Sequence, residues 1–432
     1  MARKALQRVS KVDVVVVGAG LSGLAAAWYA ARRGMKTVVL GWTRGELPFA
    51  SGLLDLLGVF PVGRGQTWDD PWAGVAALIE ACPEHPYGRL GMQRIKKAWD
   101  EFLGALAEAG MEYHGWPDRN AGAPTAAGSI KTTYRVPRTM WPGVEGLGDA
   151  RPALIVDFNG MKDFSAMQVA AVLGRHWPGL RARRLSFPYP FPGVDRNNLQ
   201  MAEALDSTEV RAALASLVRP EIEGCDLVGF PAILGMRSPR TVAGELEAMI
   251  GKPVFEIPTL PPSVPGHRLM GALDTLLTKA GVDLRLSRRL AGIDTQERRC
   301  VGVRIEVERN VETIETRGLI LATGRFIGGG LSADMERVHE TLLDLPVHQP
   351  ERREQWHRER FFDLEGHPLS RAGLLTDESF RPLDRSGGCA FENLFAIGSI
   401  LAHHDWIREK SGSGIALATA YGAVESLASF IS

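Results

Sequence analysis

Apolar residues gather along the chain in short runs that end at glycines, and these runs predict the strands of a buried parallel sheet. The first run, Val14–Val17, leads directly into Gly18-Ala19-Gly20-Leu21-Ser22-Gly23. An alanine-rich stretch then extends to about Arg33, Gly34 follows it, and residues 37–40 form a second apolar run. Apolar runs without polar alternation are typical of strands that are buried on both faces. The order of strand, glycine turn, helix and strand predicts a βαβ unit of about thirty residues.

The three glycines of the first turn suit a phosphate-binding role. Gly18 permits a tight turn, Gly20 lets the backbone approach a pyrophosphate, and Gly23 lets the helix pack closely on the strand. The helix that starts at Leu21 directs free N–H groups and the positive end of its dipole toward the phosphates. An incidental glycine turn is the alternative, and the complete βαβ context disfavours it. We therefore predict a dinucleotide site that includes Gly18, Gly20, Leu21, Ser22 and Gly23.

Two later apolar runs also end in glycine turns, at Ala322-Thr323-Gly324 and at Gly398-Ser399. A small residue is needed where the backbone passes the adenosine pyrophosphate portion of a flavin cofactor. Ser411-Gly412-Ser413-Gly414 then opens a helix expected over about 415–427. The free N–H donors of such a helix start suit the flavin N1 and C2 oxygen, which gain negative charge on reduction. We expect this flavin site to include Thr323, Gly324, Gly398, Ser399, Gly412, Ser413 and Gly414.

The middle of the chain has a different pattern. Strands are expected at 154–158 and 225–230, and helices near 164–173, 198–205 and 242–250. This alternation predicts a separate α/β domain, and the proline-rich run 258–265 marks the return from it.

The predicted fold class is therefore α/β, a Rossmann-like FAD-binding domain with an inserted α/β cap domain. The FAD-binding domain is expected in two parts, at 1–115 and 263–432, and the cap or substrate domain at 116–262. The first part of the cap, 116–148, is expected to be loop because it is rich in Gly, Pro and Thr.

The composition excludes several classes of function. Of the 432 residues, 45% are hydrophobic and 23% charged, and 50 basic and 50 acidic residues leave no net charge. This balance gives no reason to expect nucleic acid. The four cysteines form no C-x-x-C pair, so we expect no iron–sulfur or other metal site and reduced thiols in the cytoplasm. The chain contains no uninterrupted stretch of about eighteen apolar residues, so we predict no membrane span.

Several further stretches together resemble one known family. They are 51–57, Arg196-Asn197-Asn198, 258–264 with Arg268-Leu269, 328–331, 376–382 and 393–399. With the N-terminal fingerprint, they resemble the B subunit of the anaerobic glycerol-3-phosphate dehydrogenase. That family lies within the flavoprotein group of the fumarate reductase and succinate dehydrogenase flavin subunits. The resemblance spans nearly the whole chain, and the middle stretches carry it because many flavoproteins share the first and last.

The resemblance implies a peripheral flavin subunit with two partners, the catalytic A subunit plus an iron–sulfur, membrane-anchoring C subunit. Together they would oxidise sn-glycerol 3-phosphate to dihydroxyacetone phosphate and pass electrons to the quinone pool in anaerobic respiration. The chain would be cytoplasmic and held at the inner face of the cell membrane by its partners. An alternative is a flavin subunit that only relays electrons or supports the structure. An independent fumarate-reductase-like or amine-oxidising enzyme is disfavoured, because neither a dicarboxylate site nor an aromatic cage is recognisable.

The cofactor expected from the fingerprint is FAD, because the fingerprint suits a pyrophosphate, while the resemblance also allows FMN. Many dinucleotide sites carry an acidic residue after the second strand to bind the ribose. Here Leu40 leads into Gly41-Trp42-Thr43-Arg44, which has no carboxylate. Thr43 or Arg44 could contact ribose or phosphate instead, and a solvated loop arginine is the plain alternative.

The resemblance also assigns a role to the loop at Ser51 and Gly52. These residues align in order with the segment that wraps the isoalloxazine in fumarate-reductase-like proteins, where a histidine can link covalently to the flavin. No histidine lies between Gly34 and Cys82. We therefore predict a non-covalent flavin, with Ser51 and Gly52 among its binding residues.

Oxidation of an alcohol by a flavin needs a base for the hydroxyl proton and cations for the anionic group of the substrate. Arg196, His267 and Arg268 are the catalytic candidates, because Arg196 lies in the cap and the others follow its return. The two guanidinium groups could hold a phosphate, and His267 could take a proton near neutral pH. Cap salt bridges and a surface histidine are the structural alternative. His403 and His404 are a second, weaker pair of candidates.

Overall fold

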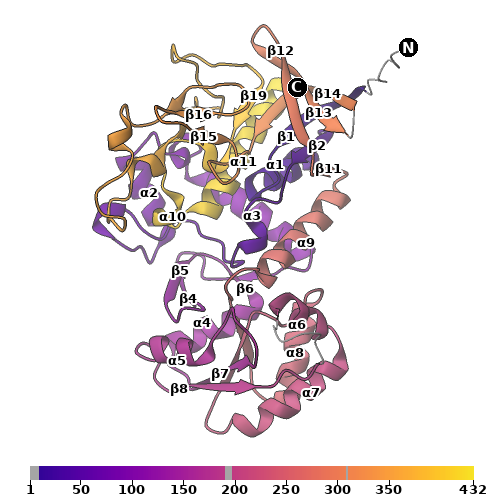
Figure 1. Ribbon diagram of the computed structural model, residues 1–432, viewed down its shortest axis with the longest axis vertical. Coiled ribbons are helices and arrows are strands. Elements are labelled where there is room, and N and C mark those ends of the chain that lie inside the picture. Colours follow the sequence, from indigo (N-terminus) through magenta and orange to yellow (C-terminus); the bar gives the residue numbers. More distant parts are fainter. Residues whose placement is uncertain (1–8, 190–196, 308–309) are drawn as a thin grey trace. The chain divides into compact units, whose positions relative to one another are not determined.

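The computed structural model describes residues 9–189, 197–307 and 310–432. It divides into two compact units, labelled by their elements in Figure 1. Unit 1 comprises residues up to Gly45, then 55–105 and 273–432, and unit 2 comprises 46–54 and 106–272. In the chain, unit 2 therefore interrupts unit 1, and the expected cap at 116–262 falls within unit 2. Both units mix helices and strands, which confirms the α/β class.

The core of unit 1 is a seven-stranded sheet in which β11, β2, β1 and β14 follow one another, with β19 beside β14. All neighbours among these five strands are parallel. Antiparallel β13 and β12 continue the sheet beyond β14. The strand bounds are β1 (Val9–Val17), β2 (Thr37–Gly41), β11 (Asp283–Leu286), β12 (Arg289–Gln296), β13 (Arg299–Val307), β14 (Asn310–Leu321) and β19 (Leu394–Ala396). Val14–Val17 are buried, as the apolar run predicted.

Three helices pack together beside this sheet: α1 (Leu21–Arg32), α3 (Met92–Glu108) and α11 (Gly412–Ile431). The Tyr29 ring of α1 lies 5.2 Å from the Tyr421 ring of α11, and its hydroxyl donates to the Ala98 carbonyl of α3 at 2.7 Å. Figure 1 shows yellow α11 next to indigo α1. By length and composition α11 could cross a membrane, but 67% of its apolar window is buried in the protein, so it is a core helix of unit 1.

Smaller elements of unit 1 surround this core. The helices are α2 (Pro71–Ala81), the short α10 (Trp406–Glu409) and the last two turns of α9, from residue 273 to 279. The strand pairs are β15 (Leu331–Ala333) with β16 (Val338–Glu340) and β17 (Val347–His348) with β18 (Gly373–Leu374). The β17 and β18 pair is antiparallel and places His348 opposite Gly373.

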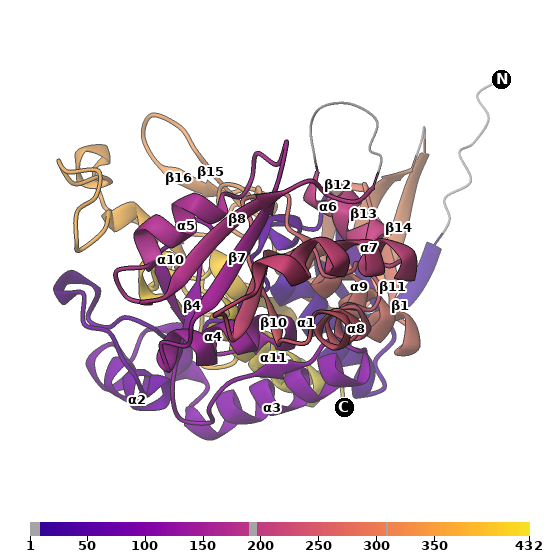
Figure 2. The same cartoon turned by 90° about the horizontal axis from the view of Figure 1, so that it is seen from below.

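Unit 2 is built on a four-stranded parallel sheet in the order β10, β9, β7, β8. The strands are β7 (Ala153–Phe158), β8 (Leu180–Leu185), β9 (Leu227–Pro231) and β10 (Val254–Ile257). Its helices are α4 (Trp141–Gly148), α5 (Ala166–Leu173), α6 (Asn198–Ala204), α7 (Thr208–Val218), α8 (Pro239–Ile250) and most of α9 (Val264–Lys279). In Figure 2, α5 lies along β7 and β8, and α7 lies beside α8.

The expectation of a loop over 116–148 is wrong. This stretch contains β4 (Ala121–Pro124), β5 (Ile130–Thr133), β6 (Val136–Pro137) and helix α4; β6 pairs with β3 (Tyr113–His114). The proline of α4 lies in the first turn, where a missing N–H costs nothing. A Cβ on Gly143 would lie 2.4 Å from the Phe255 ring, and one on Gly146 would lie 2.2 Å from Leu227. The glycines that suggested a loop therefore let α4 pack closely on the sheet.

Candidate flavin site

The first glycine turn connects β1 to α1 and is packed too tightly for side chains. Gly18 has a φ of +115°, and its N–H donates to the Leu40 carbonyl at 2.7 Å. A Cβ on Gly18 would lie 2.1 Å from the Ala322 carbonyl oxygen, and one on Gly23 would lie 1.9 Å from the Gly18 oxygen. A Cβ on Gly20 would meet no atom within 4 Å. Gly18 and Gly23 are thus fixed by packing, whereas the backbone of Gly20 is open to the approach of a ligand.

The other two glycine turns lie against the first. Gly398 has a φ of +72°, and a Cβ there would lie 2.2 Å from Oγ of Ser22. Gly324 has a φ of +70°, and a Cβ there would lie 3.5 Å from Oγ of Ser399. The Ala322 N–H donates to Val17 O at 2.8 Å. The fold of unit 1 therefore brings 18–23, 322–324 and 398–399 together, although the sequence separates them widely.

Helix α11 starts three residues earlier than expected, at Gly412, so Gly412, Ser413 and Gly414 form its first turn. The helix is attached to the third glycine turn, because the Gly398 N–H donates to Thr419 Oγ1 at 2.9 Å. The Gly414 N–H already donates to the Asp55 carbonyl at 2.8 Å. Of the three predicted donors, Gly414 therefore has a protein partner, and contact of Gly412 and Ser413 with the flavin stays a prediction.

The residues of these turns fit a cofactor with a pyrophosphate. The Thr323 Oγ1 atom is buried and has no hydrogen-bond partner among the described residues. A buried hydroxyl without a partner costs free energy, so such an atom favours a ligand in contact with it. With the open backbone at Gly20 and the start of α1 at Leu21, Thr323 would hold the phosphates and adenosine portion of FAD.

The ribose half of the site has no carboxylate for a packing reason. A Cβ on Gly41, at the end of β2, would lie 2.6 Å from the Cβ of Ala19 in the first turn. The Arg44 side chain donates to the Asp274 carboxylate at 2.8 Å, and the Thr43 hydroxyl accepts from the Gly45 N–H. Arg44 is thus largely buried and paired through Nη2, while its buried Nη1 has no hydrogen-bond partner among the described residues.

Ser51 and Gly52 belong to unit 2, and there they shape a local turn. The Ser51 hydroxyl accepts from the Leu53 N–H. Gly52 has a φ of +80°, its carbonyl accepts from the Tyr113 hydroxyl at 2.9 Å, and a Cβ there would lie 2.6 Å from the Pro265 Cβ. Their contact with the flavin stays a prediction.

The catalytic candidates predicted from the sequence differ in burial and in hydrogen-bond partners. Arg268 is buried and pairs with the Glu256 carboxylate through two nitrogens, at 2.7 and 2.9 Å. Its Nε donates to the Gly235 carbonyl at 2.8 Å, so its donor groups are engaged within unit 2. His267 is half-buried, with Nδ1 2.8 Å from the Ser263 carbonyl. Arg196 lies outside the described residues.

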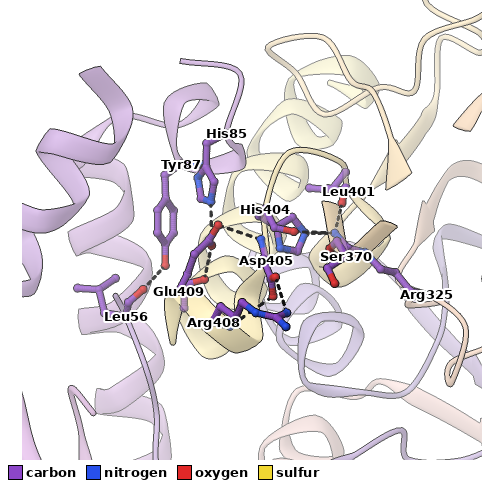
Figure 3. Close-up of polar contacts among 11 residues, drawn as sticks. Leu56, His85, Tyr87, Arg325, Ser370, Leu401, His404, Asp405, Arg408 and Glu409 are labelled. Carbon is purple, nitrogen blue, oxygen red and sulfur yellow. Dashed lines mark hydrogen bonds and ion pairs between the residues drawn. The ribbon is translucent and has the colours of Figure 1, made fainter. Parts of the chain in front are cut away.

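A buried polar cluster in unit 1 was not predicted from the sequence (Figure 3). Glu409 is buried, and its carboxylate accepts from the Asp405 N–H and the Ser411 hydroxyl at 2.9 Å each and lies 3.4 Å from Nε2 of His85. The Tyr87 N–H donates to Nδ1 of His85, which leaves Nε2 as the donor to Glu409. Burial raises the pKa of Glu409, but the hydrogen bond and electrostatic attraction of His85 and the two other donors together hold it below its ordinary value.

The second half of the cluster surrounds Arg325, which directly follows Gly324. Its guanidinium donates to the carbonyls of Ser370, Leu401 and His404, the last two at 2.9 and 3.0 Å, and lies 3.3 Å from Nε2 of His404. Burial lowers the pKa of Arg325 to about 10. His404 is fully buried, and burial followed by the charge of Arg325 lowers its pKa well below the ordinary value.

The only signal for this cluster in the sequence is the set of charged and histidine residues at 403–409, between the last glycine turn and α11. Across the described residues, no three His, Cys, Asp or Glu side chains are grouped as a metal site.

Comparisons with known proteins show the family to which the chain belongs. The model of the FAD binding domain family matches residues 13–415. A relative from Halobacterium salinarum, named as the probable B subunit of an anaerobic glycerol-3-phosphate dehydrogenase, is 34% identical over 95% of this chain and 96% of its own length. The B subunit of the anaerobic glycerol-3-phosphate dehydrogenase of Pectobacterium carotovorum is 31% identical over 96% of this chain and 98% of its own length.

Among solved structures, the 3-ketosteroid delta1-dehydrogenase of Sterolibacterium denitrificans has a TM-score of 0.47 at 13% identity, covering 98% of this chain and 100% of that one. A similarity of this size adds nothing to the assignment.

The three glycine turns and the match across nearly the whole chain define a flavoprotein of the FAD binding domain family, with FAD as its cofactor. Within that class, the chain belongs to the B-subunit family of the anaerobic glycerol-3-phosphate dehydrogenases. The resemblance seen in the sequence is thereby confirmed.

Proposed function

We propose that this chain is the FAD-carrying B subunit of a respiratory dehydrogenase that oxidises sn-glycerol 3-phosphate to dihydroxyacetone phosphate and passes electrons to the quinone pool. The observation that carries the proposal is the 34% identity with a relative of that name over 95% of the chain. The site in unit 1 supports it, because oxidation of an alcohol needs a hydride acceptor, which the bound flavin supplies.

The complex would contain a catalytic A subunit, together with an iron–sulfur C subunit that anchors it to the inner face of the cell membrane. Two features of the chain support a division of labour. Its four cysteines form no C-x-x-C pair, and the helix α11, long and apolar enough to cross a membrane, is a core helix. Iron–sulfur clusters and membrane attachment would then come from the partners.

Unit 2 would be the inserted cap or substrate domain. Its place in the chain, between parts of unit 1, supports this role. The flavin would be non-covalent, because residues 35–81 contain no histidine to link it. Ser51 and Gly52 would contact the isoalloxazine, and Arg196 and His267 would contact the substrate. Arg268 we assign to the internal support of unit 2, because Glu256 and Gly235 engage its donor groups.

The test is anaerobic reduction of the flavin in the purified full-length chain. Addition of sn-glycerol 3-phosphate without the A subunit should bleach the flavin absorbance, and acid should release FAD. A chain that stays yellow alone but bleaches when the A subunit is added would support the alternative, in which this chain only relays electrons. A chain that stays yellow in the assembled complex would contradict the proposed function.

A matched control distinguishes loss of cofactor from loss of chemistry. Gly18→Val should abolish FAD binding, since a Cβ at this position would lie 2.1 Å from a backbone oxygen. Gly104→Ala in α3, where a Cβ meets nothing within 4 Å, should retain both FAD and bleaching.

A further inference from the structure

His403 has a backbone conformation that side chains rarely adopt. Its φ is +67°, in the left-handed region, where a residue with a Cβ is strained. It lies four positions after Ser399 of the third glycine turn. A strained residue persists only where the surrounding structure enforces it, and such residues cluster at functional sites.

Arg325 enforces this conformation from the second glycine turn. Its guanidinium donates to the carbonyls of Leu401 and His404, which lie on either side of His403 in the chain. It also donates to Ser370 O, and the neighbouring Arg371 carbonyl accepts the His403 N–H at 3.1 Å. The buried guanidinium of Arg325 therefore fixes the backbone on both sides of His403. It also fixes Ser370, next to the Arg371 carbonyl that accepts the His403 N–H.

The held ring of His403 lies against a second histidine. The ring centroids of His403 and His348 are 4.4 Å apart. The contact follows from the backbone, because the Ala402 N–H donates to Leu374 O in β18, and β18 pairs with the β17 strand that carries His348. His403 is half-buried and His348 is exposed, so the pair leads from the interior of unit 1 to solvent.

We propose that His403 is the catalytic proton acceptor for the substrate hydroxyl, that Arg325 is its positioning residue, and that His348 passes the proton to solvent. This inference rests on the proposed function. In the step, the substrate O–H and C–H bonds break and a C=O bond forms. The hydroxyl proton goes to the imidazole of His403, and the hydride, with its electron pair, goes to the flavin, which is reduced as the alcohol is oxidised.

His403 is better placed for this role than the neighbouring histidine. His404 is fully buried, and its Nε2 is 3.3 Å from the Arg325 guanidinium. A base must be reachable and neutral before it accepts a proton. His403 meets both conditions, because it is half-buried and burial, with the charge of His348, lowers its pKa below the ordinary value.

The charged and titratable groups that face His403 come from two segments, β17 and residues 84–89. Besides His348 they are His85, Arg89 and Glu84, of which only Glu84 raises the pKa of His403. A base with a lowered pKa stays neutral at lower pH. The rate of flavin reduction should therefore fall only below the ordinary pKa of histidine, about 6.5.

The first test compares anaerobic flavin reduction by sn-glycerol 3-phosphate in the full FAD-loaded wild-type chain and in its variants, without the A subunit. His403→Asn and His403→Gly should each slow reduction by about 10²–10⁴-fold. FAD content should be unchanged, because His403 lies outside the three glycine turns that bind the cofactor. Imidazole added to His403→Gly should restore part of the rate. His176→Asn, an exposed histidine of unit 2, is the matched control and should reduce at the normal rate.

The second test needs no turnover and examines the positioning by Arg325. The imidazole C–H resonance of His403, identified by its loss in His403→Asn, should titrate below the ordinary pKa of histidine in the wild-type chain. In Arg325→Lys, a single ammonium cannot reach the same carbonyls, the loop relaxes, and the midpoint should move up toward about 6.5. The acidic limb of the flavin reduction profile should move up with it.

Two results would overturn the inference while leaving the proposed function intact: normal reduction by His403→Asn, or an unchanged His403 titration in Arg325→Lys. Reduction of the wild-type chain only in the presence of the A subunit would support the relay alternative and overturn this inference. Failure of both the chain and the complex to be reduced would overturn the proposed function as well.

Discussion

The end of β2 packs directly on the first glycine turn: a Cβ on Gly41 would lie 2.6 Å from the Cβ of Ala19. In many dinucleotide sites the residue at the end of the second strand is acidic and binds the ribose. At Gly41 there is no room for such a side chain. The absence of the carboxylate is therefore a property of how β1 and β2 are packed, and the ribose must be bound from elsewhere.

Restoring a carboxylate at this position should damage the site. Gly41→Glu and Gly41→Ala should both destabilise the protein, by about 1–3 kcal/mol for the overlap with Ala19. Both should also weaken FAD binding. Chemical denaturation and flavin content of the purified variants measure the two effects. Gly104→Ala is the control: Gly104 is an exposed position of α3 with open space around it, so the substitution should stabilise by about 0.5–1 kcal/mol. Tighter FAD binding by Gly41→Glu would contradict this account.

The contact between Gly398 and Ser22 predicts a coupled pair of substitutions. Gly398→Ala should lower stability and flavin content, because its Cβ would lie 2.2 Å from the Ser22 hydroxyl and its φ of +72° is strained for alanine. Ser22→Gly in the same chain removes the overlap and leaves only the strain, about 1–2 kcal/mol. A double-mutant cycle on denaturation should give a favourable coupling of about 0.5–3 kcal/mol. Additive effects would show that the two turns do not touch.

The ion pair between Arg268 and Glu256 predicts a structural effect of Arg268 substitutions. Arg268→Leu leaves the buried Glu256 carboxylate without its cation and should destabilise unit 2 by about 3–5 kcal/mol. Arg240→Ala removes an ion pair to Glu112 whose arginine side chain is 65% exposed, and should cost less than about 1 kcal/mol. Urea unfolding measures both. A stable Arg268→Leu variant that only raises the KM for the substrate would return Arg268 to the substrate site.

The carboxylate of Glu409 predicts a loss of stability in acid. Its folded pKa lies below the ordinary value of 4.5, so it binds a proton more weakly in the folded protein than in the unfolded chain. Its contribution is fully present above about pH 4.5 and is lost as the pH falls through the lower folded pKa. Glu409→Gln should flatten this acidic decline in denaturation curves measured from pH 7 downward. Glu80→Gln, on the exposed side of α2, should leave the decline unchanged.

Local patterns in the sequence were sufficient for the first βαβ unit. The apolar run, the glycines and the alanine-rich stretch predicted the ends of β1, α1 and β2 to within a residue or two, because short-range interactions decide most of these bounds. The exception is the start of β1, which lies earlier, at Val9. Helix α4 was missed for the opposite reason. Gly143 and Gly146 suggested a loop, but they are needed because a side chain at either position would overlap Phe255 or Leu227, which lie far along the chain.

The buried cluster shows the same limit for the site. His85 and Glu409 are 324 positions apart, and nothing local marks them as partners. Their pairing depends on the path of the chain between η3 (Pro86–Arg89) and α10, which is a tertiary property. The Arg268 ion pair is similar, because the sequence offered a cation but could not show that Glu256 engages it.

The pairing of β1 with β14 also has a consequence for how the protein is made. Val14 lies beside Gly318, and roughly 300 residues are synthesised between them, including all of unit 2. At about 5–20 residues per second, the nascent β1 edge waits roughly 15–60 s for its neighbour. The third glycine turn and α11 emerge later still. The nucleotide-binding sheet therefore closes only after unit 2 has been synthesised. The FAD site forms later than unit 2, and the unpaired β1 edge is exposed to aggregation until then.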